Sequence, residues 1–174
     1  AAKLVEFGFQ VRGWSRTPKS LPKVESFFGQ DRLPAFLSKT EILVCLLPLT
    51  DETRGILNAS LFAQLPRSAS LINAARGGHL VEADLSAAMA SGQINAATLD
   101  VFETEPLPSD HPFWLTERLY ITPHNASITD PRSAAWRIAK QIAKYEAGEG
   151  LDNMVDRARG YCHRGVDCAR QPSL

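Results

Sequence analysis

Several features that define whole classes of protein are scarce or missing in this 174-residue sequence. It has three cysteines, Cys45, Cys162 and Cys168, too few for the disulfide framework of a small secreted domain. Lys plus Arg and Asp plus Glu number 19 each, so no net charge attracts nucleic acid or an anionic membrane. No apolar run approaches the ~20 residues that cross a bilayer. We therefore expect a globular cytoplasmic protein with reduced thiols, no nucleic-acid partner and no membrane anchor.

The C-terminal tail holds a small group of potential metal ligands, Cys162, His163 and Cys168. Their spacing matches no common zinc pattern, so we predict no metal site. Residues 162–174 show no hydrophobic periodicity, and we expect a disordered tail. Cys45 lies in an apolar run and is predicted to be a buried thiol.

Short apolar segments alternate with segments of helical periodicity, which is typical of a parallel α/β sheet. Some of them, above all ILVCLLP and SLINAA, are continuously apolar, as expected for strands covered on both faces. The predicted strands are residues 10–14, 42–47, 70–74, 97–102 and 119–122.

Helical segments lie between the predicted strands, at residues 2–7, 33–37, 60–65, 82–91 and 131–147. Asn58 and Asp130 are suitable N-caps for two of them. The last helix is the longest, and its apolar positions follow the i, i+3, i+4 spacing of one buried stripe. These positions are Ala135, Ile138, Ile142 and Tyr145.

Three polar residues stand just after predicted strands. Arg76 follows SLINAA, Glu105 follows ATLDVF, and His124 follows LYITP. Because ligands of open parallel sheets bind at the carboxyl ends of the strands, we expect these side chains to converge at one edge.

The three residue types together suit the reduction of a 2-keto acid. An arginine fork binds a carboxylate, a histidine donates a proton near neutral pH, and a carboxylate orients the imidazole. Each residue alone has a simpler explanation. Arg76 before two glycines suits a solvated turn, His124 after proline suits a surface or capping position, and Glu105 by itself carries little information.

Four motifs in fixed order, LLPLTDETRGILN, LINAARGG, LDVFETEPLP and ITPHNASIT, resemble the D-isomer-specific 2-hydroxyacid dehydrogenases. The sequence is most similar to the glyoxylate/hydroxypyruvate reductases of that family, a likeness to which WSRTPKS and VDRARGY add. The resemblance covers residues 1–161 and implies a doubly wound parallel, Rossmann-type nucleotide-binding domain. It also implies reduction of a small 2-keto acid, such as glyoxylate or hydroxypyruvate, by a nicotinamide cofactor.

The resemblance assigns roles to the three polar residues. Arg76 matches the arginine that binds the substrate carboxylate, His124 the general acid/base, and Glu105 the acid paired with that histidine. Asp100 matches the residue that holds the nicotinamide carboxamide. The further positions that the resemblance places at the cofactor are Pro48, Thr53, Ala74 and Ala126.

The segment after the first predicted strand bears on the choice of cofactor. An NAD site of this fold has an acidic residue there, which binds the ribose 2′-hydroxyl. Here the sequence offers Ser15, Arg16, Thr17 and Lys19 and no acid, which favours the 2′-phosphate of NADPH, with NADH possible. A plain polar turn is the alternative explanation of these residues.

The family's G-x-G-x-x-G loop does not occur in the sequence, which also starts without Met. We therefore expect the C-terminal part of a longer enzyme, homodimeric when intact and inactive as this part alone. Residues 1–128 are predicted to form a partial dinucleotide-binding domain without its first strand. Residues 129–161 are predicted to form a long helix and a segment returning towards the substrate domain. Strands 10–14 and 42–47 would then face a gap, or slide together and pair.

Two alternatives remain open at this stage. One is a non-enzymatic, dinucleotide-sensing module like the corepressors of this family, which keep the same three residues. The other is an enzyme of the same family that acts on phosphoglycerate, lactate or formate.

Overall fold

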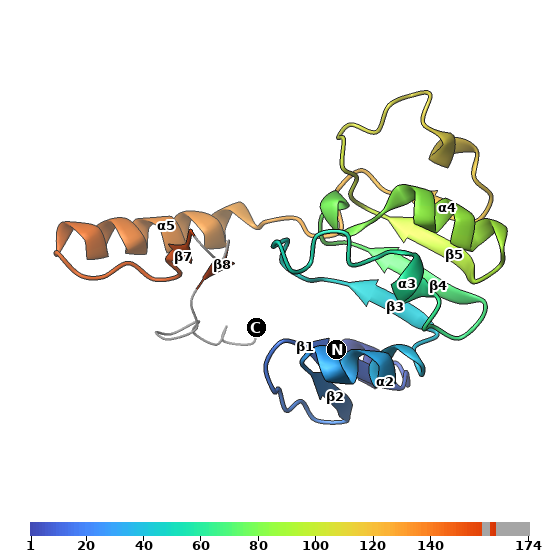
Figure 1. The fold of residues 1–174 in the computed structure, drawn as a ribbon. Helices are drawn as coiled ribbons and strands as arrows, with labels where there is room; N and C mark the ends of the chain where they lie inside the picture. Colours follow the sequence, from blue (N-terminus) through green and yellow to red (C-terminus); the bar gives the residue numbers. More distant parts are fainter. Residues whose placement is uncertain (158–160, 163–174) are drawn as a thin grey trace.

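A computed structural model describes residues 1–157 and 161–162 of the chain. The described part forms α-helices, short 3-10 turns, two parallel sheets and one antiparallel pair (Figure 1). The helices are α1 (Ala2–Glu6), α2 (Leu33–Leu37), α3 (Ala59–Phe62), α4 (Glu82–Ala90) and α5 (Pro131–Glu146). The strands are β1 (Val11–Ser15), β2 (Val24–Phe28), β3 (Ile42–Cys45), β4 (Ala69–Asn73), β5 (Ile94–Leu99), β6 (Leu119–Ile121), β7 (Val155–Asp156) and β8 (Tyr161–Cys162).

The larger sheet has the order β3-β4-β5-β6, and all its strands are parallel. The strands pair in register, so that Cys45, Asn73, Leu99 and Ile121 lie side by side near their carboxyl ends. The core packs on this sheet and takes apolar side chains from α3 and α4, among them Phe62 and Leu85.

The expectation that the strands are covered on both faces is wrong for β3. Leu43 and Cys45 are buried, whereas Ile42 and Val44 on the other face are 52% and 42% exposed. The core side chains from α3 and α4 reach only one face of this strand. Cys45 is a buried free thiol, as predicted, and burial raises its pKa.

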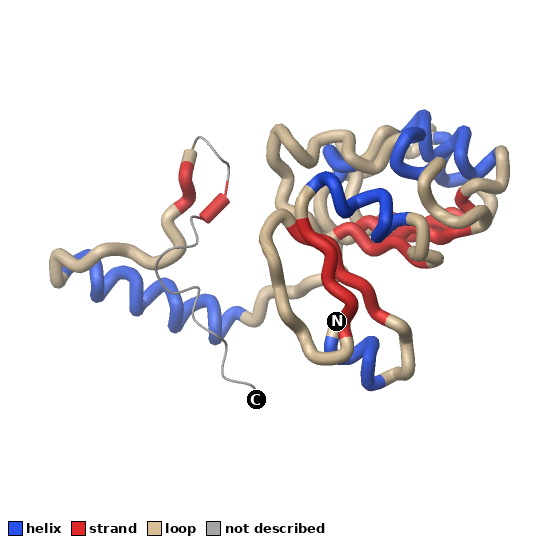
Figure 2. The backbone as a smooth tube through the Cα atoms, turned by 60° about the horizontal axis from the view of Figure 1, so that its bottom comes forward, coloured by secondary structure: helices blue, strands red, loops and turns tan. Residues whose placement is uncertain are grey.

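The smaller sheet pairs β1 with β2 in parallel and is separate from the larger one (Figures 1 and 2). Strand β2 was not predicted, because VESFF interrupts its apolar residues with Glu25 and Ser26. In the described chain no strand lies between β1 and β3, and the two do not pair. Of the two predicted outcomes, the gap is therefore correct and the direct pairing is wrong.

Helix α5 projects away from the sheets in both views (Figures 1 and 2). The Asp130 carboxylate caps it by accepting from the amides of Arg132 and Ser133, as predicted. The prediction of a buried stripe is wrong, since none of its residues is buried and Ile138 is 61% exposed. The apolar residues have helical spacing, but within the described chain the helix does not pack on either sheet.

The segment after α5 folds back along the helix, because Asp152 accepts from Lys144 Nζ at 2.6 Å and from Gln141 Nε2 at 2.8 Å. Cys162 belongs to β8, while the rest of the predicted tail, including His163 and Cys168, lies outside the described residues. Among the described helices, none is long and apolar enough to cross a membrane.

Candidate active site

The predicted site residues lie after the strands of the larger sheet, at its carboxyl edge. Pro48 follows β3, Arg76 follows β4, Glu105 follows β5, and His124 follows β6. Since all these strands are parallel, turns that are far apart in sequence meet at one edge.

The structure brings Glu105 and His124 into direct contact. Oε2 of Glu105 lies 2.8 Å from Nδ1 of His124, and Oε1 accepts a hydrogen bond of 2.9 Å from the amide of Phe102. The bond from His124 is the largest influence on the Glu105 carboxyl and, with that from Phe102, lowers its pKa. Glu105 is therefore ionised at neutral pH and fixes one nitrogen of the imidazole.

The turn that carries His124 has a conformation that side chains rarely adopt. His124 has a φ of +51°, and its amide bonds back to the carbonyl of Thr122 at 3.0 Å. A positive φ outside glycine costs free energy and persists only where the surroundings hold it. Such strain at a polar residue is typical of functional sites.

Asp100 holds this turn by hydrogen bonds. Its buried carboxylate accepts from Thr122 Oγ1 at 2.5 Å and from the amides of Asn125 and Ala126 at 2.9 and 3.0 Å. Burial raises the pKa of Asp100, but these hydrogen bonds outweigh it, so that the pKa is lowered. The carboxylate thus holds the Thr122 side chain before His124 and the backbone amides after it.

Arg76 is exposed at the start of the turn that follows β4, and its Nη1 donates to the carbonyl of Ala75 at 2.6 Å. Its positive charge contributes to the lowered pKa of Glu105. The side chain of Asn73, buried at the end of β4, accepts from the amide of Ala75 and donates to the carbonyl of Arg76. Arg76 therefore stands on a fixed turn near the Glu105–His124 pair.

Gly77 brings the Arg76 turn against the Glu105 turn. A Cβ atom at Gly77 would lie 1.9 Å from the carbonyl carbon of Phe102 and 2.2 Å from the amide nitrogen of Glu103. Only glycine allows two backbone segments to approach this closely. The residue is thus required for the spacing between Arg76 and Glu105.

His111 anchors the far side of the loop that carries Glu105. Its Nδ1 accepts from the amide of Phe113 at 3.2 Å, which leaves the proton on Nε2, 3.2 Å from the Glu82 carboxylate. This contact joins the loop to the first turn of α4.

The predicted cofactor residues form a second group at the same edge. The Thr53 hydroxyl accepts from the amide of Thr50 at 2.9 Å and donates to the carbonyl of Pro48 at 2.7 Å, which closes the turn after β3. Ala74 is half-buried directly after β4, and Ala126 is exposed beside the His124 turn.

The segment predicted to select the cofactor lies on the smaller sheet. Ser15 ends β1, and Arg16, Thr17 and Lys19 follow it with exposed side chains. Ser15 Oγ donates to the carbonyl of Thr17 at 2.9 Å, so the segment forms an ordered turn. The structure thus places these residues apart from the Glu105–His124 pair, on the other side of the gap between the sheets.

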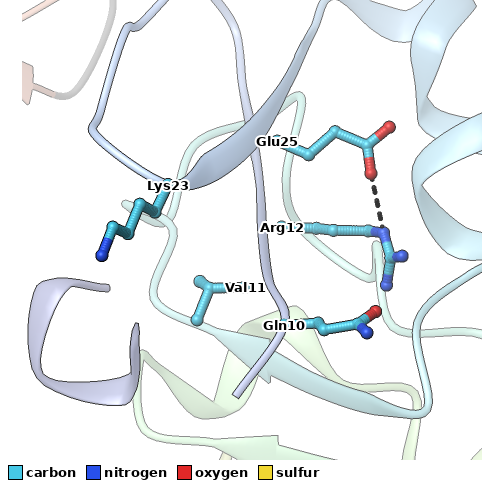
Figure 3. Close-up of a pocket in the computed structure, with 5 residues that line it drawn as sticks. All are labelled: Gln10, Val11, Arg12, Lys23 and Glu25. Atoms are coloured by element: carbon cyan, nitrogen blue, oxygen red, sulfur yellow. Dashed lines mark hydrogen bonds and ion pairs between the residues drawn. The ribbon is translucent and has the colours of Figure 1, made fainter. Parts of the chain in front are cut away.

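A pocket of about 210 Å³ lies at the amino ends of β1 and β2, the ends farther from Ser15 (Figure 3). Its residues include Arg12, which bonds to Glu25 at 2.9 Å and to the carbonyl of Lys39 at 2.9 Å. This pocket is at the amino ends of the strands and is therefore distinct from the site. Within residues 1–157 and 161–162, no cluster of three or more His, Cys, Asp or Glu residues could hold a metal ion.

Comparison with known proteins decides the family. Residues 1–126 match the model of the D-isomer specific 2-hydroxyacid dehydrogenase, NAD binding domain. The chain belongs to the D-isomer-specific 2-hydroxyacid dehydrogenase family. The family and the Rossmann-type fold predicted from the motifs are therefore confirmed.

Relatives within this family are similar over most of the chain. The glyoxylate/hydroxypyruvate reductase A of Yersinia enterocolitica is 56% identical over 92% of this chain, which spans 51% of that relative. The chain thus spans about half the length of the curated relatives it matches.

Solved structures of family members agree with the fold. A D-isomer specific 2-hydroxyacid dehydrogenase from Xanthobacter autotrophicus, in complex with NADPH and MES, is 54% identical with a TM-score of 0.88. That match covers 92% of this chain and 66% of the other. An NADPH-dependent glyoxylate/hydroxypyruvate reductase from Sinorhizobium meliloti, in complex with NADP and sulfate, is 45% identical with a TM-score of 0.88. It covers 92% and 52% of the two chains.

Sequence reasoning missed three residues that build the site, Asn73, Gly77 and His79. Asn73 and His79 are both fully buried polar side chains directed at backbone groups near Arg76. The glycine pair was visible as part of LINAARGG, but the close approach to Phe102 depends on tertiary packing. A polar residue ending an apolar strand, as Asn73 does, was the available signal.

Proposed function

We propose that this chain forms the catalytic part of an NADPH-dependent reductase of small 2-keto acids, such as glyoxylate or hydroxypyruvate, with NADH as a possible second cofactor. The observation that carries the proposal is the 2.8 Å contact between Glu105 and His124, close to Arg76 at the carboxyl edge of the sheet. The relatives that are 49–56% identical bear the name glyoxylate/hydroxypyruvate reductase A, which supports the substrate class.

Each of the three residues has a separate task in this reaction. Arg76 binds the substrate carboxylate, and its planar fork sets the orientation of the keto acid. Glu105 keeps Nδ1 of His124 occupied, which leaves Nε2 for the substrate oxygen, and it stabilises the charged imidazolium. Bound NADPH would supply a hydride to the carbonyl carbon and become NADP⁺.

His124 supplies the matching proton. The electron pair of the carbonyl π bond moves to oxygen, which takes the proton from the imidazolium to give the 2-hydroxy acid. His124 must then be reprotonated. Its side chain is 47% exposed, so water can reach the ring for this step.

The described residues suit the 2′-phosphate end of the cofactor. Arg16 and Lys19, with the hydroxyls of Ser15 and Thr17, form a segment without an acid that suits a 2′-phosphate. The NADPH and NADP in the Xanthobacter and Sinorhizobium structures support this choice. The turns that would line the rest of the cofactor are those of Pro48, Thr53, Ala74 and Ala126.

Asp100 has few acceptor sites left for the carboxamide of the nicotinamide ring. A carboxylate has about four acceptor sites, and three of them are already used by Thr122, Asn125 and Ala126. Its main task is therefore to hold the His124 turn.

The names of the relatives favour an enzyme over a corepressor-like module. Among family members, a phosphoglycerate dehydrogenase from Lactobacillus plantarum is only 30% identical, which also favours the glyoxylate and hydroxypyruvate class. A homodimer in the cytoplasm, and domain limits at residues 128 and 161, belong to the same proposal.

The proposal is tested on a two-part hybrid, because the chain spans 51% of the Yersinia enterocolitica relative. This chain is fused to the half of that relative which it does not match. Consumption of NADPH with glyoxylate or hydroxypyruvate is the expected result. A folded hybrid that binds NADPH but reduces neither acid would contradict the proposal.

A further inference from the structure

His79 is a fully buried histidine that the roles above do not use. It ends the 3-10 turn Gly77–His79, directly after Arg76. Its Nδ1 lies 3.0 Å from the carbonyl oxygen of Arg76, and its Nε2 lies 3.3 Å from the carbonyl oxygen of Pro48. One imidazole thus spans the turns that follow β4 and β3.

The two carbonyls have other partners, but these partners are local. The Pro48 carbonyl accepts from Thr53 in its own turn, and the Arg76 carbonyl accepts from Asn73 and from the amide of His79. The His79 ring adds a side-chain link from one turn to the other, beside the backbone hydrogen bonds of Gly55 to Gly78 and of Leu57 to His79.

The chemistry of the ring makes this link specific. A neutral imidazole carries one N–H, so it donates to one of the two carbonyls, whereas the protonated ring donates to both. Either form places a rigid ring between the two turns, and at 0% exposure the ring is shielded from solvent.

We propose that His79 is a positioning residue, which fixes the Arg76 turn against the Pro48 turn and so aligns the keto-acid site with the cofactor site. This inference rests on the proposed function, because it takes Arg76 as the substrate ligand and Pro48 as part of the cofactor site. His79 touches neither ligand and acts only through these two backbone turns.

Three substitutions in the hybrid enzyme separate the two links. The amide nitrogen of Asn can take the place of Nδ1 and that of Gln the place of Nε2, whereas Leu fills the space without a donor. His79→Leu should raise the KM for glyoxylate and the KM for NADPH, each about three- to tenfold, as expected for the loss of a hydrogen bond, with a smaller change in kcat. His79→Asn should restore the KM for glyoxylate, and His79→Gln should restore only the KM for NADPH.

Dissociation constants for NADPH, and for oxalate in its presence, are measured on the same proteins. These values score the inference even if the hybrid shows no turnover, an outcome that would contradict only the proposed function. Gln93→Leu is the matched control, since Gln93 Nε2 also donates to two carbonyls, those of Phe62 and Leu65, but away from the site. It should lower the melting temperature without changing either constant. If His79→Leu leaves both ligand constants unchanged, or if the Asn and Gln variants behave alike, the inference is wrong. The comparison of the Asn and Gln variants stands even if the Leu variant does not fold.

Discussion

Nδ1 of His124 lies 2.8 Å from Oε2 of Glu105, although the two residues follow different strands and are separated by 19 positions. The other carboxylate oxygen accepts from the amide of Phe102, so both oxygens of Glu105 are held and the carboxylate cannot rotate freely. The imidazole is thereby fixed at one nitrogen, and its remaining nitrogen is available for proton transfer.

Replacing His124 should chiefly affect the chemical step. In the hybrid enzyme, His124→Ala should lower kcat by about 10²–10⁴-fold, the usual contribution of a general acid. Glu105→Gln should give a smaller loss, because the ring remains but its orientation and charge are less well supported. Steady-state kinetics measures kcat, and fluorescence titration measures NADPH affinity. A His124→Ala enzyme with normal kcat would remove the residue from the mechanism.

Replacing Arg76 should chiefly affect binding of the keto acid. Arg76 is exposed, and its charge pair with the substrate carboxylate becomes enclosed only when the keto acid binds. Loss of a pair enclosed in this way costs about 2–5 kcal/mol, so Arg76→Ala should raise the KM for glyoxylate about 30-fold or more. Arg76→Lys should recover only part of this loss, because it keeps the charge but not the planar fork. The affinity for NADPH serves as the internal control. Equal KM values for Arg76→Ala and the parent would exclude this role.

The cofactor preference should depend on Arg16. We expect the hybrid enzyme to prefer NADPH to NADH, and Arg16→Asp to reverse or abolish this preference, because a carboxylate repels the 2′-phosphate and binds the 2′-hydroxyl. The ratio of kcat/KM values for the two cofactors is the measurement. An unmutated enzyme that uses both equally well would contradict the interpretation of Arg16 and Lys19.

Gly77 and Gly78 should differ sharply in their tolerance of a methyl group. Gly77→Ala places a Cβ 1.9 Å from the backbone of Phe102, so the two turns must separate, at a cost of about 1–3 kcal/mol in stability. In Gly78→Ala the nearest atom is Arg54 Nη1, at 2.9 Å, the end of a flexible side chain that can move away. Urea unfolding of both variants tests this. Equal stability of the two variants would show that the turns are not held at this spacing.

Acid should destabilise the protein partly through Asp100 and Glu105. Both have a pKa below its usual value in the folded chain, so the folded chain binds fewer protons than the unfolded chain. Their contribution to stability is complete above the unfolded pKa, about 4, and is lost as the pH falls through the folded value. The destabilisation caused by Asp100→Asn should therefore be greatest near neutral pH and shrink below about pH 4.

This pH effect is measured by urea unfolding at a series of pH values. Glu117→Gln, at an exposed position, is the control and should change stability little at any pH. A cost of Asp100→Asn that stays constant down to acid pH would show that the ionised carboxylate does not hold the His124 turn.

Much of the fold was predictable because its strands and caps carry local signals. Asn58 and Asp130 cap helices α3 and α5 as predicted, since side-chain capping depends on a few neighbouring residues. The prediction for β5 was three residues too late at both ends, because the apolar run continues through Val101 and Phe102. These two residues are buried in the turn after the strand. Burial, which a sequence pattern reports, is not the same as extended structure.

The pairing of Glu105 with His124 was predictable, because both stand at the ends of parallel strands in recognisable motifs. The role of Asp100 in holding the His124 turn was not predictable, since its hydrogen bonds to Thr122 and to two backbone amides arise from tertiary contact. The stripe on α5 failed for a related reason. Helical periodicity shows which residues share a face, but not whether that face meets the core.

The separation of the two sheets divides the protein into two units that should differ in the free energy of local opening. The buried cluster draws its members from residues 37–113 and includes none from β1 or β2. The β1–β2 unit, whose Phe27 meets this cluster through Phe36, should therefore open more readily than β3–β6, with faster amide hydrogen exchange. Arg76, Glu105 and His124 belong to the slowly exchanging unit, and residues 15–19 to the other. Local opening would thus release the segment around Arg16 while the catalytic geometry persists.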